Sequence, residues 1–208
     1  GAQGFCATHH GENDADAWHQ PAPARFLFTD NRYKLHACCH GTHAMIEALT
    51  SLMPAIAGRP VGSIAVGTNP RWLSVCDIKV PRTGLEVKFS YAHIAAMVLS
   101  GISTAADETY TDALAADPSL RAEAARLTAI GRDHLGDGEA ELTVTLLDGE
   151  TLAATYDLDA PTDLDTLGAA LQAKATALIG RDHAAALWRR LENLPGLSAN
   201  DLAQSIVA

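Results

Sequence analysis

The stretch ELTVTLLDGETLAATYDL, residues 141–158, gives the clearest fold signal in the chain. Its first half alternates apolar and polar side chains, which is the two-residue period of a half-buried strand. Asp148 and Gly149 then form a dipeptide that is typical of tight turns, and a second run with strand character follows. We therefore predict a β-hairpin with one apolar face, and other elements must cover that face.

Helical patterns occur on both sides of this hairpin. Apolar residues recur at three- and four-residue spacing between Met45 and Ile56, and the segment AGRP at 57–60 ends that predicted helix. Residues 90–99 are predicted to form a buried helix that Gly101 closes. Asp117 followed by Pro118 is typical of a helix start, because a capping side chain precedes a proline in the first turn.

Several shorter segments complete the prediction. Residues 61–69 alternate like a strand, and WLSVCDIKV at 72–80 is predicted to continue that strand or to pair with it. RLTAI at 126–130 and ARFLFTD at 24–30 are further strand candidates, whereas 103–116 is expected to be a loop or a short helix.

The last 45 residues or so are predicted to be helical. Thr162 or Asp163 caps the first of these helices, and Ser198 with Asp201 has the spacing of a capping box. Strands and helices are interleaved without strict alternation, which predicts an α+β fold: a small sheet with a hairpin covered by helices. We expect an α+β domain at 1–160 and a C-terminal helical segment at 161–208.

Composition narrows the classes of function. The 208 residues are 48% hydrophobic, with a formal net charge of -10 and a pI near 5.2. Such an acidic chain is not expected to bind nucleic acid or a membrane surface, because both are polyanionic. There is no apolar run of about 20 residues that would span a bilayer. The four cysteines lack disulfide-framework spacing, so we expect a reduced, cytoplasmic protein.

The stretch KLHACCHGTHAMIEAL, residues 34–49, holds the candidate functional residues. A metal site is the first interpretation, because Cys38, Cys39, His40 and His43 are all competent zinc ligands. Their spacing does not match the usual paired pattern, so we expect no metal. A reactive thiol before a helix N-terminus is the second interpretation, and burial of the cysteines as small core residues is its alternative.

Anion binding and proton transfer are compatible with each other in the same stretch. A helix that starts near Gly41 and Thr42 offers free N–H groups, and Lys34, His40 and His43 lie beside it in sequence. A partly desolvated lysine also loses some of its pKa and can remove a proton next to a carboxylate. Each residue taken alone has a simple alternative, a solvated surface lysine or a packed histidine.

Residues 34–43, with a lysine, cysteines and a Thr-His pair just before the predicted helix, resemble the C-terminal half of the MmgE/PrpD family. Other segments match the family in the same order along the chain: GAQGF, GSIAVGTNPRWLSV, GLEVKFSYAHIAAMVLSG, DPSLRAEAARLTAI, AELTVTLLDGETLAA and LQAKATALIG. The family includes 2-methylcitrate dehydratase, cis-aconitate decarboxylase and iminodisuccinate epimerase. The resemblance implies an enzyme without metal or other cofactor, whose active site lies between this part and an N-terminal helical domain.

The resemblance also assigns residues. Lys34 falls on the family's active-site lysine, His43 on a histidine of the same motif, and Cys39 where decarboxylase-like members have a histidine. A thiol does not reproduce imidazole proton chemistry at pH 7, which puts decarboxylation in doubt. His40, Gly41 and Thr42 are expected to cradle a carboxylate, and Arg82 is a further candidate contact. Ser90 and Lys88 are expected to have structural roles, and His93 to be packed.

We therefore expect part of a hydro-lyase that acts on a di- or tricarboxylate by removing an α-proton. An epimerase of an iminodisuccinate-like dicarboxylate is the runner-up, and a non-catalytic interaction module is the third possibility. Because an initiator methionine and the family's helical domain are both missing, we expect this chain to be the later part of a longer protein. The expected partners are a small carboxylate, the missing helical domain and a second copy in a homodimer.

Overall fold

A four-stranded mixed sheet is the centre of the fold in the computed structural model, which describes residues 31–207. The strands are β1 (Val61–Thr68), β2 (Leu127–Gly131), β3 (Glu139–Leu146) and β4 (Thr151–Asp157), in the order β2-β1-β3-β4. β1 is parallel to β2 and antiparallel to β3, and β3 and β4 form the predicted hairpin. Gly149 in its turn has φ 92°, a value that a residue without a Cβ adopts at little cost.

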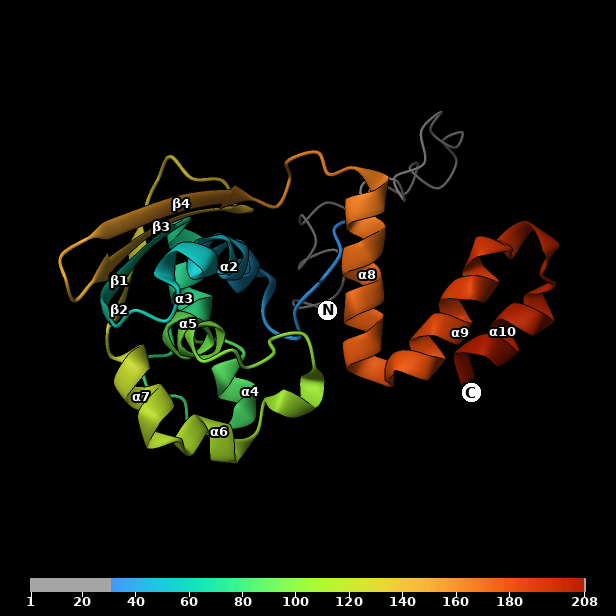
Figure 1. Ribbon diagram of the computed structural model, residues 1–208, viewed down its shortest axis with the longest axis horizontal. Helices are drawn as coiled ribbons and strands as arrows, with labels where there is room; N and C mark the ends of the chain where they lie inside the picture. The colour runs from blue at the N-terminus through green and yellow to red at the C-terminus, as the bar shows by residue number, and fades with distance from the viewer. Residues whose placement is uncertain (1–30, 208) are drawn as a thin grey trace, which may run out of the picture. The chain divides into compact units, whose positions relative to one another are not determined.

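One face of the sheet is covered by helices (Figure 1). Every second side chain of β3 is buried there, from Ala140 through Leu142 and Val144 to Leu146. The helix α2 (His43–Ile56) packs against β3 and β4, and α5 (Tyr91–Leu99) packs against α2 and β2. The predicted α+β class is confirmed, because the apolar stripe of α2 and the apolar face of the hairpin cover each other.

Three predicted helix starts are confirmed by their capping side chains. Ser90 accepts a hydrogen bond from the His93 amide at the start of α5. Asp117 caps α7 (Pro118–Ala124), and Asp163 caps α8 (Leu164–Ile179). These caps satisfy amides that no helical carbonyl can reach, so each helix begins where its capping residue stands.

The strand predicted at 72–80 is wrong. The structure has the 3₁₀ turn η4 (Pro70–Trp72) and the helix α3 (Leu73–Cys76) at this point. Asn69 accepts a hydrogen bond from the Arg71 amide, and Pro70 stands in the first turn, so the chain turns at once after β1. The short helices α4 (Gly84–Val87), η5 (Asp107–Thr109) and α6 (Asp112–Ala116) occupy other connections.

The C-terminal region is helical, as predicted. After α8, the helix α9 (Arg181–Glu192), the turn η6 (Leu194–Gly196) and α10 (Ala199–Val207) follow. Ser198 and Asp201 exchange the hydrogen bonds of a capping box. None of the helices within 31–207 is long and apolar enough to cross a membrane. The strand predicted at 24–30 lies outside the described residues.

Candidate active site

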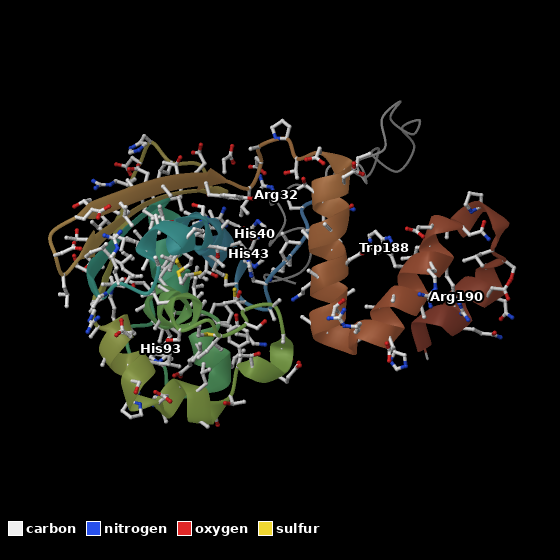
Figure 2. All side chains as sticks on the ribbon, viewed as in Figure 1. Arg32, His40, His43, His93, Trp188 and Arg190 are labelled. Atoms are coloured by element: carbon white, nitrogen blue, oxygen red, sulfur yellow. The ribbon has the colours of Figure 1, made fainter. Side chains whose placement is uncertain are left out.

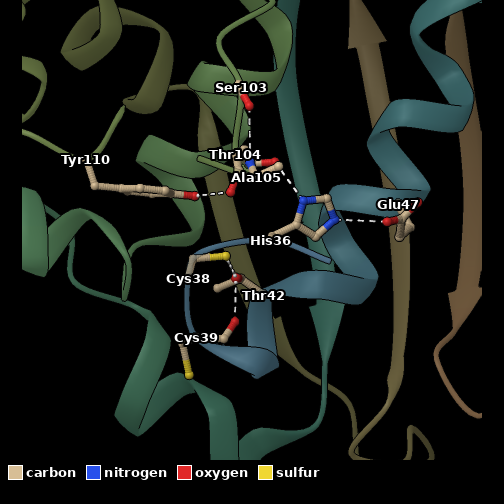
Figure 3. A network of polar contacts seen from close by, with 9 residues as sticks. All are labelled: His36, Cys38, Cys39, Thr42, Glu47, Ser103, Thr104, Ala105 and Tyr110. Carbon is tan, nitrogen blue, oxygen red and sulfur yellow. Dashed lines mark hydrogen bonds and ion pairs between the residues drawn. The ribbon is translucent and has the colours of Figure 1, made fainter. Parts of the chain in front are cut away.

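Residues 34–43, here called the cluster loop, lead through the turn η3 (His40–Thr42) into α2. The Thr42 hydroxyl donates a hydrogen bond to the Cys39 carbonyl at 2.8 Å and lies 3.1 Å from the Cys38 sulfur (Figure 3). The Cys39 amide also donates to the Lys88 carbonyl at 3.0 Å. These contacts close the loop on itself and attach it to the segment before α5.

Gly41 is held between two aromatic side chains. Its carbonyl accepts a hydrogen bond from the Tyr91 hydroxyl at 2.7 Å. The indole of Trp72 packs so closely that a Cβ at position 41 would lie 2.4 Å from its nearest atom. Only glycine fits this contact, so the η4–α3 turn that the sequence did not predict supports the cluster loop.

Three imidazole rings gather at the start of α2. The His43 ring meets His36 edge to face at a centroid distance of 4.9 Å and lies 5.1 Å from His40. His36 lies 2.9 Å from a Glu47 carboxylate oxygen and 2.7 Å from the Thr104 hydroxyl, so both of its nitrogens have partners (Figure 3). Figure 2 shows His40 and His43 close together at this end of the helix. The contacts of His36 fix its ring beside His43.

His43 is kept neutral by its surroundings. Only 1% of its surface is exposed, and its Nε2 has no hydrogen-bond partner among the described residues. Burial first, and then the neighbouring His36 and His40, lower its pKa to about 3. Near pH 7 the ring is therefore an uncharged hydrogen-bonding group with a free nitrogen, and it cannot serve as an imidazolium acid.

The two adjacent cysteines have opposite environments. The Cys39 thiol is half-buried, and a hydrogen bond from Cys76, together with the amides of Gly41 and His40, lowers its pKa to about 6. The buried Cys38 thiol has a raised pKa, because burial disfavours its charged form. All three of Cys38, Cys39 and Cys76 are free thiols. Cys39 is therefore the more acidic of the two thiols, and Cys38 packs as a small core residue.

Lys34 and Arg82 lie in different settings. Lys34 is exposed, and its ammonium group donates a hydrogen bond back to the Cys38 carbonyl at 3.2 Å. The described residues bury it only slightly, so its desolvation in a pocket stays a prediction. The Arg82 side chain is 81% exposed and is paired with Glu86, and none of its described contacts reaches the cluster loop.

Sequence reasoning did not find Glu47, Thr104 or Cys76 as site residues. Glu47 lies one turn beyond His43 on α2, which is a visible helical spacing. Thr104 and Cys76 come from distant segments that no local pattern connects with residues 36–39. Within residues 31–207, no three His, Cys, Asp or Glu side chains are arranged to hold a metal ion.

Comparison with known proteins gives one family. The sequence model described as MmgE/PrpD C-terminal domain matches residues 36–180, which run from His36 to the glycine after α8. A search among curated proteins found no match.

Proposed function

We propose that this chain, which belongs to the MmgE/PrpD family, takes part in removing the α-proton of a small di- or tricarboxylate. The family includes lyases of the 2-methylcitrate dehydratase type, and dehydration is the outcome we favour. We further propose that a helical domain of the family's N-terminal type, and a second copy of the chain, complete the pocket.

One observation carries this proposal: the cluster loop brings the exposed Lys34 ammonium group and the Cys39 thiol, whose pKa is lowered, to one turn above the buried His43 imidazole. Lys34 donates to the Cys38 carbonyl, Cys39 lies one residue further, and His43 begins the helix. A cation and a base are parts that carbanion chemistry next to a carboxylate needs.

The proposed roles follow from the charge of each group. Lys34 binds a substrate carboxylate, because its exposed ammonium group has no carboxylate partner among the described contacts. Cys39 accepts the α-proton, because its pKa of about 6 makes it an anion at neutral pH. His43 is buried and neutral, so it positions the turn that carries Cys39 and does not itself touch the substrate.

The lowered pKa of Cys39 also bears on whether decarboxylation is possible. A cysteine in place of the histidine of decarboxylase-like members puts decarboxylation in doubt, since an ordinary thiol titrates well above neutral pH. With a pKa of about 6, the Cys39 thiol titrates in the same range as an imidazole. Epimerisation is the second candidate. It begins with the same proton removal and needs only the return of the proton to the other face of the carbon.

The test measures hydrogen–deuterium exchange at the carbon next to a carboxylate, and NMR in deuterated water monitors this exchange. Small di- and tricarboxylates are incubated with the chain alone and with a family N-terminal domain added. We expect exchange with at least one of them, and we expect its loss in Cys39→Ala. Exchange of full rate in that variant would assign the proton to another group, and no exchange under any condition would refute the proposed function.

A further inference from the structure

The loop at residues 103–107, here called the platform loop, contacts the cluster loop from the other side. The Thr104 carbonyl accepts a hydrogen bond from the Ala37 amide at 2.8 Å, and its hydroxyl lies 2.7 Å from His36 Nδ1 (Figure 3). Tyr110 donates to the same carbonyl at 3.0 Å. The platform loop is therefore fixed against the residues that carry Lys34 and Cys39.

Two lysines from distant elements reach the same platform loop. Lys174 of α8 donates a hydrogen bond from Nζ to the Ala105 carbonyl at 2.6 Å. Lys88, just before α5, forms an ion pair with Asp107 and lies 5.2 Å from the centre of the Tyr110 ring. With Lys34, these two lysines bring three ammonium groups to the cluster loop and the platform loop.

The charges of this group do not cancel. Asp107 is the carboxylate that contacts these lysines in the described residues, and Lys88 already holds it. Lys34 and Lys174 make their described hydrogen bonds to backbone carbonyls, which carry no countercharge. Glu47, an acid that contacts the cluster loop, is engaged with His36. Within the described residues, three ammonium groups stand against the Asp107 carboxylate and the Cys39 thiolate, which leaves a local excess of one positive charge, although the chain carries -10 overall.

Electrostatic effects at Lys174 agree with this geometry. Its pKa is lowered, first by burial and then by repulsion from Lys88 and Lys34, while Cys38 and Asp107 oppose the shift. The three lysines are thus close enough to influence one another. Placing like charges together costs free energy, and an anion bound among them would recover that cost.

We propose that Lys174 and Lys34 together bind two carboxylates of one small polycarboxylate across the platform loop. This inference rests on the proposed function, and it adds a substrate-binding residue from α8 that the sequence interpretation did not include. Lys174 lies within the part of the chain that the family model matches, which ends at Gly180. A ligand with a single carboxylate would leave one of the two ammonium groups without its partner.

The structural alternative is that Lys174 only fastens α8 to the Ala105 carbonyl. In that case a neutral side chain at 174 would lower stability and leave anion affinity unchanged. A charge-preserving substitution separates the two roles, because arginine keeps the positive charge but changes the reach and shape of the donor group. Lys79 is the matched control, since its side chain is 59% exposed and is paired with Asp77 on the surface.

The experiment measures binding of citrate, and of acetate as a monocarboxylate probe, by isothermal titration calorimetry at low and high salt. The proteins are the unchanged chain and the variants Lys174→Met, Lys174→Arg and Lys79→Met, with thermal unfolding recorded for each. We expect Lys174→Met to weaken citrate binding by about tenfold or more, because charge-assisted hydrogen bonds are strong. Lys174→Arg should stay within a few-fold of the unchanged chain, and Lys79→Met should not differ from it.

Equal citrate affinity in Lys174→Met and Lys79→Met would overturn the inference, as would failure of the unchanged chain to bind citrate any more tightly than acetate. The proton-exchange assay keeps the two proposals apart. Exchange that proceeds with an unaltered KM in Lys174→Met supports the function and refutes this inference. Citrate binding that depends on Lys174, without exchange of any carboxylate, supports the inference and refutes the function.

Discussion

His43 and His93 are buried to the same degree, yet they belong to different parts of the molecule. Each is 1% exposed, each lies in the first turn of a helix, and burial lowers the pKa of each imidazole. Figure 2 shows His93 away from His40 and His43. The charged side chain that acts on His93 is Arg121, whereas His43 adjoins two further imidazoles and the Lys34 charge.

This difference shows that burial of a histidine does not by itself identify a site. The surroundings of His93 are those of a packed core residue, which is the role expected from the sequence. The surroundings of His43 combine titratable groups of three kinds within one loop. Substitutions and pH changes that affect one region and spare the other therefore test whether the cluster loop is functional.

The largest expected effect is on turnover. In Lys34→Met we expect proton exchange to fall by about a thousandfold or more, because removing a charged group that contacts the transition state costs several kcal/mol. Thermal unfolding should be nearly unchanged, since Lys34 is exposed. Lys79→Met serves as the surface control, and an unaltered turnover number in Lys34→Met would remove this lysine from the mechanism.

The next effect is on folding stability. Gly41→Ala places a Cβ against the Trp72 indole, and we expect a loss of roughly 3 kcal/mol, at the upper end of the range for overpacked sites. Gly168→Ala in α8 is the control, because its Cβ would meet Trp188 at an ordinary 3.7 Å. Denaturant unfolding of both variants checks the prediction. Equal stability of the two would show that Trp72 moves aside freely.

Acid should destabilise the chain through His43. Its pKa is about 3 in the folded protein and 6.5 as an ordinary value, so the unfolded chain takes up the proton first. The stability that the neutral ring contributes is complete above pH 6.5 and is lost progressively as the pH falls toward 3. At pH 5 we expect a loss of about 2 kcal/mol.

His43→Gln should reduce the loss of unfolding free energy in acid. His134→Gln should not reduce it, because the His134 side chain is 68% exposed. Urea titrations between pH 7 and 4.5 measure the difference. Parallel pH curves for the two variants would mean that His43 is protonated as readily in the fold as in the unfolded chain.

Thiol reactivity should separate neighbouring cysteines. Alkylation of Cys39 by iodoacetamide should rise with a midpoint near pH 6, whereas Cys38 should react only at alkaline pH, because burial raises its pKa. Cys76→Ala removes the hydrogen bond that lowers the pKa of Cys39 and should shift that midpoint upward. Mass spectrometry of the alkylated peptides gives each rate, and a common midpoint for Cys38 and Cys39 would contradict the assignment.

The smallest effect is expected for Cys38→Ser. The side chain is buried against the Thr42 hydroxyl and takes no part in the proposed chemistry, so exchange rates should stay within a few-fold. A complete loss of exchange in a folded Cys38→Ser variant would move the thiol chemistry from Cys39 to its neighbour.

The elements that local sequence predicts well are those whose signals lie within a few residues. The hairpin follows from alternation and the Asp148-Gly149 turn, and the starts of α5, α7 and α8 follow from Ser90, Asp117 and Asp163. The error at 72–80 has a local cause too. Asn69 and Pro70 are a turn signal, and it was outweighed by the apolar residues that follow.

The site was predictable only in part. The cluster loop was found, because its cysteines and histidines are adjacent in sequence. Its partners were not, since Thr104 lies 68 residues from His36 and Lys174 lies 69 residues from Ala105. Such contacts depend on how helices pack on the sheet, and neither periodicity nor spacing contains that information.

The contact between Trp72 and Gly41 has a practical consequence. An indole changes its emission when its surroundings change, and this one lies against the backbone of the turn that carries the candidate thiolate. In a chain with Trp18 and Trp188 replaced by phenylalanine, Trp72 becomes an intrinsic fluorescent reporter of that turn. Ligand occupancy could then be followed in real time without an added dye, before any substrate is known.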